Sequence, residues 1–205
     1  MLADAGLNRW LKKEREEAYS DWLAWILEQL GSTADVLKVI GITEPEIVAN
    51  SQSGAFKIER EQCIPAGRLD LLLTLSDSLM IIVEVKKYSA EASDTAKQAG
   101  YYEWLESQPV GQRRALLLTT DAAEEKYENF STVLWADVCI RLRRLLPTLS
   151  TRIGSVKTAM LVAFIGAVET NLLNLVAPRQ TEAVRRLSYA GTIEHLKSYL
   201  KGGAV

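Results

Sequence analysis

Two carboxylates and one lysine have the types and spacing to do chemistry together: Asp70, Glu84 and Lys86. They lie in two apolar runs separated by the three-residue loop 76–78, a pattern that predicts an antiparallel β-hairpin. With that loop, the numbers of paired residues sum to 154, which sets Asp70 opposite Glu84. The period of two along a strand then brings all three side chains to one face of the sheet.

Carboxylates directly opposite each other in an antiparallel ladder lie roughly 5 Å apart at Cβ and repel each other. The strands around them are strongly apolar, so an uncompensated charge there is costly. Mg²⁺ would offset the repulsion, because it accepts one or two carboxylates and keeps its other positions for water and phosphate oxygens. Lys86, on the same face, could then orient or deprotonate a water beside the phosphate.

A simpler interpretation of the same residues is an ion pair at a strand end, in which Lys86 neutralises Asp70 or Glu84. The pattern Glu-x-Lys is common enough to arise by chance. The register also depends on the loop, because a two-residue loop would shift the pairing by one and send Asp70 to the other face. The residues alone leave both alternatives open.

Asp70, followed by Glu84-Val85-Lys86 at the end of an apolar strand, resembles the motif of the PD-(D/E)xK nuclease superfamily. Many members carry a Gln and an aromatic on the helix after that strand, and Gln98 and Tyr102 lie one turn apart in the corresponding segment. Members also supply a glutamate from the helix before the sheet. Glu16 stands there, beside the apolar stripe of that helix.

The resemblance covers about residues 8–135, and it departs from the family pattern at Leu69, where the motif has proline. The metal ligands that it implies are Asp70, Glu84, Glu16 and the backbone carbonyl of Val85, with Mg²⁺ as the ion and Mn²⁺ as its substitute. Lys86 would position the attacking water, and Gln98 would orient Lys86 or a phosphate. Residues expected to contact the nucleic acid are Lys87, Tyr102 and Arg68.

The elements that must position these residues follow in the order helix, three strands, helix, two strands, then helices. Helices are expected over 8–30, 33–40, 92–107, 137–146, 155–176 and 181–200, and strands over 56–64, 68–75, 79–86, 114–120 and 132–135. Pro147 and Pro178 are expected to end the helices before them, and residues 43–55 are expected to form a loop with at most a brief turn.

This order predicts an α/β fold with a restriction-endonuclease-like core, in which helices flank a central mixed β-sheet. We expect a single domain over 1–205, with an αβββαβ core at 8–135 and a helical C-terminal third at 136–205 packed on it. A chain of 205 residues with 48% apolar residues can bury one sizeable core.

The charge balance excludes a polybasic nucleic-acid coat, because 24 basic residues face 26 acidic ones. A local basic groove is still allowed, and its candidate residues are Arg60, Arg68, Lys87, Lys97, Arg113 and Arg114. Because so neutral a chain should bind nucleic acid weakly, a homodimer or a delivering protein partner would strengthen binding.

The cysteines and the apolar stretches indicate the compartment. Cys63 and Cys139 lie far apart and outside any CxxC or Cys/His cluster, which argues against a structural zinc site. We expect reduced, half-buried thiols in a cytoplasmic protein. The N-terminus has no apolar signal region, and the stretch 159–168 is about half as long as a membrane span requires.

These patterns predict a metal-dependent nuclease that hydrolyses phosphodiester bonds, of DNA in preference to RNA. One alternative is a catalytically silent module on the same fold that binds nucleic acid or protein. The usual mark of such a module is loss of the Asp, Glu or Lys, and all three are present here. The other alternative is an unrelated α/β enzyme that uses a metal for phosphate-ester chemistry on small substrates.

Overall fold

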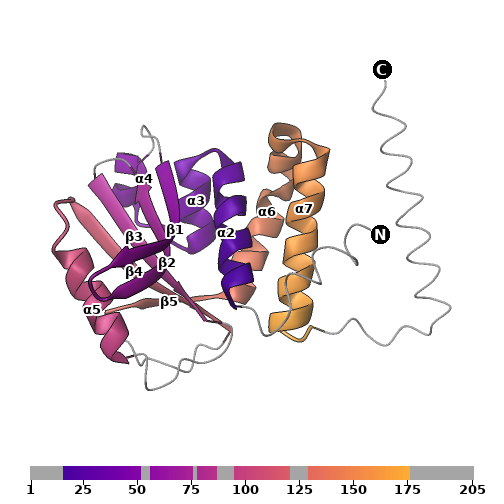
Figure 1. Cartoon of the computed structure of the whole chain (residues 1–205). Helices are drawn as coiled ribbons and strands as arrows, with labels where there is room; N and C mark the ends of the chain where they lie inside the picture. Colours follow the sequence, from indigo (N-terminus) through magenta and orange to yellow (C-terminus); the bar gives the residue numbers. More distant parts are fainter. Residues whose placement is uncertain (1–15, 52–55, 76–77, 87–94, 121–128, 176–205) are drawn as a thin grey trace, which may run out of the picture. The chain divides into compact units, whose positions relative to one another are not determined.

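The computed structural model describes residues 16–51, 56–75, 78–86, 95–120 and 129–175 (Figure 1). The chain divides into two compact units, residues 1–174 and 175–205. Residues 8–15 of the expected first helix and the whole helix expected over 181–200 lie outside the described residues.

The described elements follow the predicted order of helices, three strands, one helix, two strands and further helices. The helices are α2 (Glu16–Leu30), α3 (Thr33–Ile40), α4 (Pro45–Ser51), α5 (Thr95–Glu106), α6 (Trp135–Ile153) and α7 (Ser155–Ala167), and the π-helical turn η4 (Val168–Leu172) follows α7. The strands are β1 (Phe56–Ile64), β2 (Gly67–Leu75), β3 (Leu79–Val85), β4 (Gln112–Thr119) and β5 (Ser131–Leu134). The α/β prediction is confirmed.

The strands form one mixed sheet in the order β1-β2-β3-β4-β5. The first three are antiparallel, as consecutive hairpins require, and β4 and β5 join in parallel after crossovers through α5 and the segment that follows β4. Between β2 and β3 the pairs run from Leu75↔Leu79 to Leu71↔Val83, so paired numbers sum to 154. This is the register that the three-residue loop predicts.

Both faces of the sheet are covered, because the central strands are apolar on both sides. In Figure 1, α5 lies on one side of the sheet and α2, α3 and α6 lie on the other. Leu71 and Val83 belong to the main core with α2, α3 and α6. Leu72 and Ile82 belong to a smaller cluster with Tyr101 of α5.

The apolar stripe predicted for the first helix is the face of α2 that packs on the sheet. Its residues are all buried: Tyr19, Leu23, Ile26, Leu27 and Leu30. Glu17 and Glu28, away from that face of α2, are exposed. The next helix also follows its signals, since Ser32 caps α3 by accepting a hydrogen bond from the Asp35 N–H, and Gly41 ends it with a positive φ.

The prediction that Pro147 ends a helix is wrong, because α6 continues to Ile153 with the proline inside it. An internal proline costs about 3 kcal/mol or more. Leu145 and Leu149, on either side of it, are both buried in the main core. Each such burial is worth about 1.5–3 kcal/mol, so packing offsets the local cost.

Residues 43–55, expected to be a loop, contain the helix α4. Pro45 occupies its first position, where the missing N–H costs nothing, and Ile47 is fully buried. The helix expected over 155–176 is α7 followed by η4. No helix among the described residues is long and apolar enough to cross a membrane.

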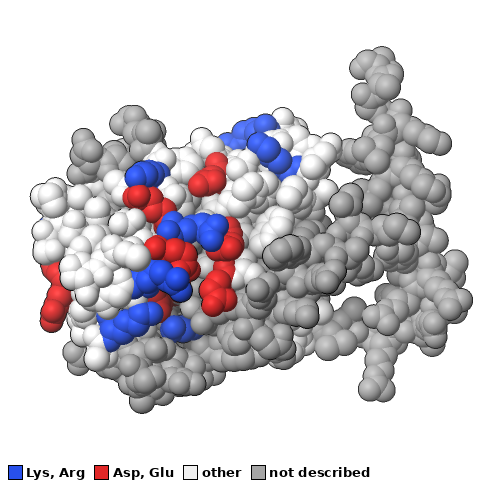
Figure 2. Space-filling model, viewed as in Figure 1, with Lys and Arg blue, Asp and Glu red and all other residues white. Residues whose placement is uncertain are grey.

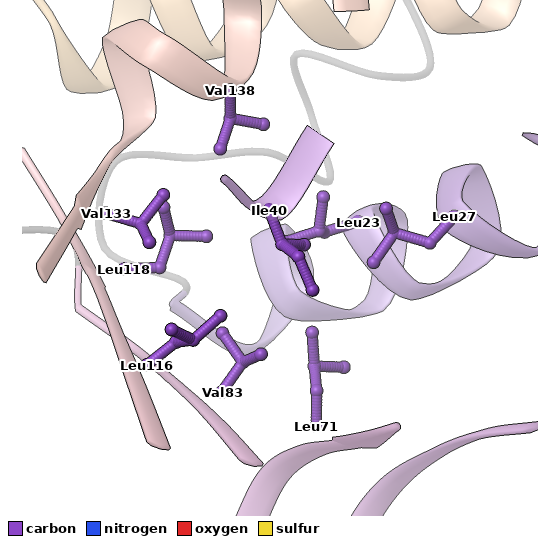
Figure 3. A pocket seen from close by; sticks show the side chains of 9 residues that line it. All are labelled: Leu23, Leu27, Ile40, Leu71, Val83, Leu116, Leu118, Val133 and Val138. Carbon is purple, nitrogen blue, oxygen red and sulfur yellow. The ribbon is translucent and has the colours of Figure 1, made fainter. Parts of the chain in front are cut away.

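A small cavity lies in the main core, between the sheet and the helices α2, α3 and α6 (Figure 3). Nine apolar residues line it: Leu23, Leu27, Ile40, Leu71, Val83, Leu116, Leu118, Val133 and Val138. A lining without polar groups offers a water or a polar substrate no hydrogen-bond partner. This cavity is therefore a gap in core packing and not a site for polar chemistry.

We expect Leu71→Ala to lower the free energy of unfolding by about 2–5 kcal/mol, because Leu71 is fully buried and its truncation would enlarge the cavity that it lines. Urea denaturation measures this change. Val156→Ala is the control, since that side chain is 72% exposed and its removal should change stability by less than about 0.5 kcal/mol. Equal losses in the two variants would contradict the assignment of Leu71 to the core.

The two cysteines, both expected to be half-buried, differ in environment. Cys63 on β1 is exposed, whereas Cys139 on α6 is buried in the main core. Burial, and next the nearby Glu169 charge, raise the pKa of the Cys139 thiol to about 12. Because the thiolate is the reactive form, a buried thiol with so high a pKa reacts very slowly at neutral pH in the folded protein.

We expect Ellman's reagent at pH 8 to label one thiol per folded chain, at Cys63, and both thiols after denaturation. Absorbance at the released thiolate band counts the reacting groups. Cys63→Ser should remove the fast reaction and leave only labelling that follows unfolding. Rapid labelling of two thiols in the folded wild type would contradict the burial of Cys139.

Candidate active site

The chemistry-bearing residues lie where the ladder between β2 and β3 ends. One step beyond its last recorded pair, Leu71↔Val83, come Asp70 on β2 and Glu84 on β3. Asp70 Oδ2 accepts a hydrogen bond from the backbone N–H of Val85 at 2.8 Å. The Asp70 carboxylate therefore binds β3 directly and fixes the two strands against each other at this point.

The backbone of Glu84-Val85-Lys86 is held from two further directions. The Lys86 N–H donates to the Leu118 carbonyl of β4 at 2.7 Å, and Trp135 Nε1 of α6 donates to the Lys86 carbonyl at 3.2 Å. Trp135 is itself fully buried. Neighbouring strands and a helix thus fix the segment that carries the candidate glutamate and lysine.

Glu84 carries a buried negative charge, with 2% of its side chain exposed. Two ammonium groups approach its Oε1 atom, Lys86 Nζ at 3.1 Å and Lys97 Nζ of α5 at 3.6 Å. The ion pair of the simpler interpretation is therefore present. That interpretation does not explain why an apolar strand should bury the glutamate at all, since an exposed pair at the strand end would avoid the desolvation cost.

Lys97 reaches Glu84 along the surface of Tyr101, with its Nζ 5.1 Å from the ring centroid. The Tyr101 hydroxyl donates to the Arg68 carbonyl at 2.6 Å, which fixes the ring on the β1–β2 hairpin. Burial alone lowers the pKa of the Lys97 ammonium, but the Tyr101 side chain and the Glu84 charge together outweigh it and raise the pKa. Burial raises the pKa of the Tyr101 hydroxyl.

Gln98 is 1% exposed, and neither its amide nitrogen nor its amide oxygen has a hydrogen-bond partner among the described residues. Leaving such a group unpaired inside a protein costs about 1–3 kcal/mol. Gln98 is adjacent in sequence to Lys97, which contacts Glu84. A buried amide without a partner is the pattern expected where a bound group completes a site.

Two glycines set how closely α5 approaches the β1–β2 turn. A Cβ atom on Gly100 would lie 2.8 Å from Ala66 Cβ, closer than real Cβ atoms approach. Gly67 has φ +139°, and a Cβ there would lie 3.1 Å from the Tyr101 hydroxyl. The close packing that these glycines permit brings Lys97 and Gln98 to the site.

The sequence model of the PD-(D/E)XK nuclease superfamily matches residues 7–201. The chain belongs to this superfamily. The predicted restriction-endonuclease-like fold class is confirmed, and the match extends past residue 135 through the helices that follow β5. No curated protein and no solved structure matches the chain.

The structure does not bring the other predicted site residues of this PD-(D/E)XK protein to Glu84 through any contact that it describes. Glu16 is the first residue of α2, on the opposite side of the sheet from α5, and its role stays a prediction. Lys87 lies outside the described residues. Tyr102 is half-buried beside the α5 cluster, and the exposed Arg68 pairs with Glu61.

Sequence reasoning missed three contacts of this superfamily member. The Tyr101 hydroxyl donates to the Arg68 carbonyl, and Trp135 Nε1 donates to the Lys86 carbonyl. Lys97 was expected only at the rim, but it contacts Glu84. The sequence held one signal for the Lys97 contact. A lysine in the first turn of a helix opposes the helix dipole, so a nearby carboxylate is a favourable partner.

The donor set fits a hard divalent cation. Among the described residues, no three His, Cys, Asp or Glu side chains group closely enough to hold a metal. The ligand roles of Asp70 and Glu84 stay predictions. Mg²⁺ needs only one or two carboxylates, and both candidates offer oxygen rather than sulfur or nitrogen. The buried Glu84 charge and the unpaired Gln98 amide agree with a site that another group completes.

We expect Gly100→Ala to destabilise this PD-(D/E)XK protein by about 1 kcal/mol, because overpacking against Ala66 outweighs the gain in helix propensity. Urea denaturation measures the change. Ala66→Gly combined with Gly100→Ala exchanges the two residues and should recover most of the loss, with Ala66→Gly alone as control. A Gly100→Ala variant more stable than wild type would contradict the close contact.

Proposed function

We propose that this protein is a metal-dependent nuclease that hydrolyses phosphodiester bonds of DNA. The observation that carries the proposal is the buried Glu84 carboxylate, which lies 3.1 Å from the Lys86 ammonium and, like Asp70, one residue beyond the last β2–β3 pair. Membership of a nuclease superfamily supports the same reaction. The residues also fit the ion that such hydrolysis requires.

Asp70 and Glu84 hold the divalent cation, together with the Val85 carbonyl and Glu16. When bound, Mg²⁺ or Mn²⁺ supplies charge stabilisation at the phosphate and makes water a stronger nucleophile. The hydrogen bond from the Val85 N–H holds the Asp70 carboxylate in one orientation before any ion arrives. This preorganisation reduces the cost of bringing two carboxylates together at the moment of binding.

Lys86 orients the attacking water and stabilises the charge that develops on the phosphate. Its side chain is 15% exposed, so little bulk water competes with its contacts, and its backbone is bonded to β4 and α6. Gln98 uses its unpaired amide to orient Lys86 or a phosphate oxygen. These residues place donors where charge develops, which is the largest contribution to many such reactions.

Lys87, Tyr102 and Arg68 contact the nucleic-acid backbone near this site. The face shown in Figure 2 carries basic and acidic side chains side by side, in line with the net charge of −2. Such a surface gives weak affinity for a polyanion. The nuclease therefore acts as a homodimer or with a delivering protein partner, on DNA in the cytoplasm.

We expect the protein to cut supercoiled and linear DNA in the presence of Mg²⁺ or Mn²⁺ and to be silent with EDTA. Lys86→Ala should slow single-turnover cleavage at least about 10²-fold, because it removes a preorganised donor to the developing charge. Asp70→Asn should slow it as severely, because it removes a metal ligand. Gel electrophoresis of the products measures both rates.

Lys157→Ala is the control, because that lysine is exposed on α7 and lies outside the site. Equal cleavage rates for wild type and Lys86→Ala would contradict the proposal. DNA binding without cutting would favour the silent module, whereas hydrolysis of small phosphate esters alone would favour the unrelated phosphoesterase. Cutting of RNA but not DNA would change the substrate and keep the site.

A further inference from the structure

A second lysine, Lys97, shares the Glu84 carboxylate with Lys86, and the two ammonium groups approach the same oxygen. We propose that Lys97 is a built-in cation that neutralises Glu84 until a divalent ion displaces it, after which its ammonium binds a phosphate of the nucleic acid. The inference rests on the proposed nuclease function. It assigns to one residue two alternating partners, a carboxylate and a phosphate.

The two lysines differ in how firmly the fold holds them. Lys86 follows β3 directly, and its N–H and carbonyl are both hydrogen-bonded to other elements. Its side chain is 15% exposed, compared with 41% for Lys97. Lys97 is also the more distant from Glu84 Oε1, at 3.6 Å against 3.1 Å. Lys97 is therefore the cation that can leave.

Lys97 has a surface along which it can move. Its Nζ lies 5.1 Å from the centre of the Tyr101 ring, whose face attracts cations, and Tyr101 is fixed to the strand backbone through its hydroxyl. The Lys97 stem already passes beside the hairpin turn, since a Cβ on Gly67 would lie 3.6 Å from Lys97 Cε, in van der Waals contact. The stem can swing outward over the hairpin turn while its base stays packed.

Charge supplies the reason to move. A divalent cation at Glu84 would lie within a few ångströms of both ammonium groups, and like charges at that distance repel strongly in a partly buried site. The displaced Lys97 ammonium then faces solvent at the edge of the site, where the phosphate backbone passes. Metal binding and phosphate binding therefore favour each other, and the coupling is reciprocal.

The first experiment measures Mn²⁺ binding without nucleic acid, by the electron paramagnetic resonance signal of free Mn²⁺. Lys97→Met keeps the stem on Tyr101 and removes the competing charge, so we expect it to bind Mn²⁺ about tenfold more tightly than wild type. Lys97→Arg keeps the charge and should bind Mn²⁺ like wild type. Lys157→Met removes an exposed charge on α7 and should change nothing.

The second experiment measures single-turnover cleavage of DNA at saturating Mn²⁺. Lys97→Met should cleave about tenfold more slowly, although it binds the metal more tightly. Unchanged or weaker Mn²⁺ binding by Lys97→Met, with wild type active, would overturn this inference and leave the nuclease proposal intact. A wild type that neither binds Mn²⁺ nor cleaves DNA would overturn the nuclease proposal itself, and this inference with it.

Discussion

The site depends on the placement of a carboxylate inside an apolar sheet. Glu84 is the penultimate residue of β3, a strand that packs on both faces, so its charge lies away from water and must be balanced by the protein or by a ligand. Contacts from neighbouring elements position this carboxylate and balance its charge. Asp70 fixes the strand end, Trp135 and β4 hold the backbone, and α5 brings the Lys97 ammonium close.

The sheet register and the fold class could be predicted from sequence because they depend on local signals. A three-residue loop fixed the pairing of β2 with β3 from Leu75↔Leu79 to Leu71↔Val83. That Asp70 and Glu84, one residue further on, share one face of the sheet stays a prediction. The helix α4 and the passage of α6 through Pro147 could not be predicted, since buried Ile47 and Leu149 stabilise them through contacts distant in sequence.

The candidate site divides in the same way. The strand residues follow from the motif and the register, whereas the α5 residues depend on how that helix docks. The contact of Tyr101 with the Arg68 carbonyl accompanies a close approach of Gly100 to Ala66, which no periodicity in α5 reveals. The contact of Lys97 with Glu84 follows from that docking, because it depends on the rotation of the whole helix.

The hydrogen bond from Trp135 to the Lys86 carbonyl has a consequence for modularity. Trp135 begins α6 and stacks edge-to-face on Tyr19 of α2 and Phe164 of α7, so the helices after the sheet are mechanically connected to the lysine. The αβββαβ core is therefore not a detachable cassette. Shortening the chain at residue 134 would remove a wall of the site, and recombination between relatives would have to exchange the core and α6 together.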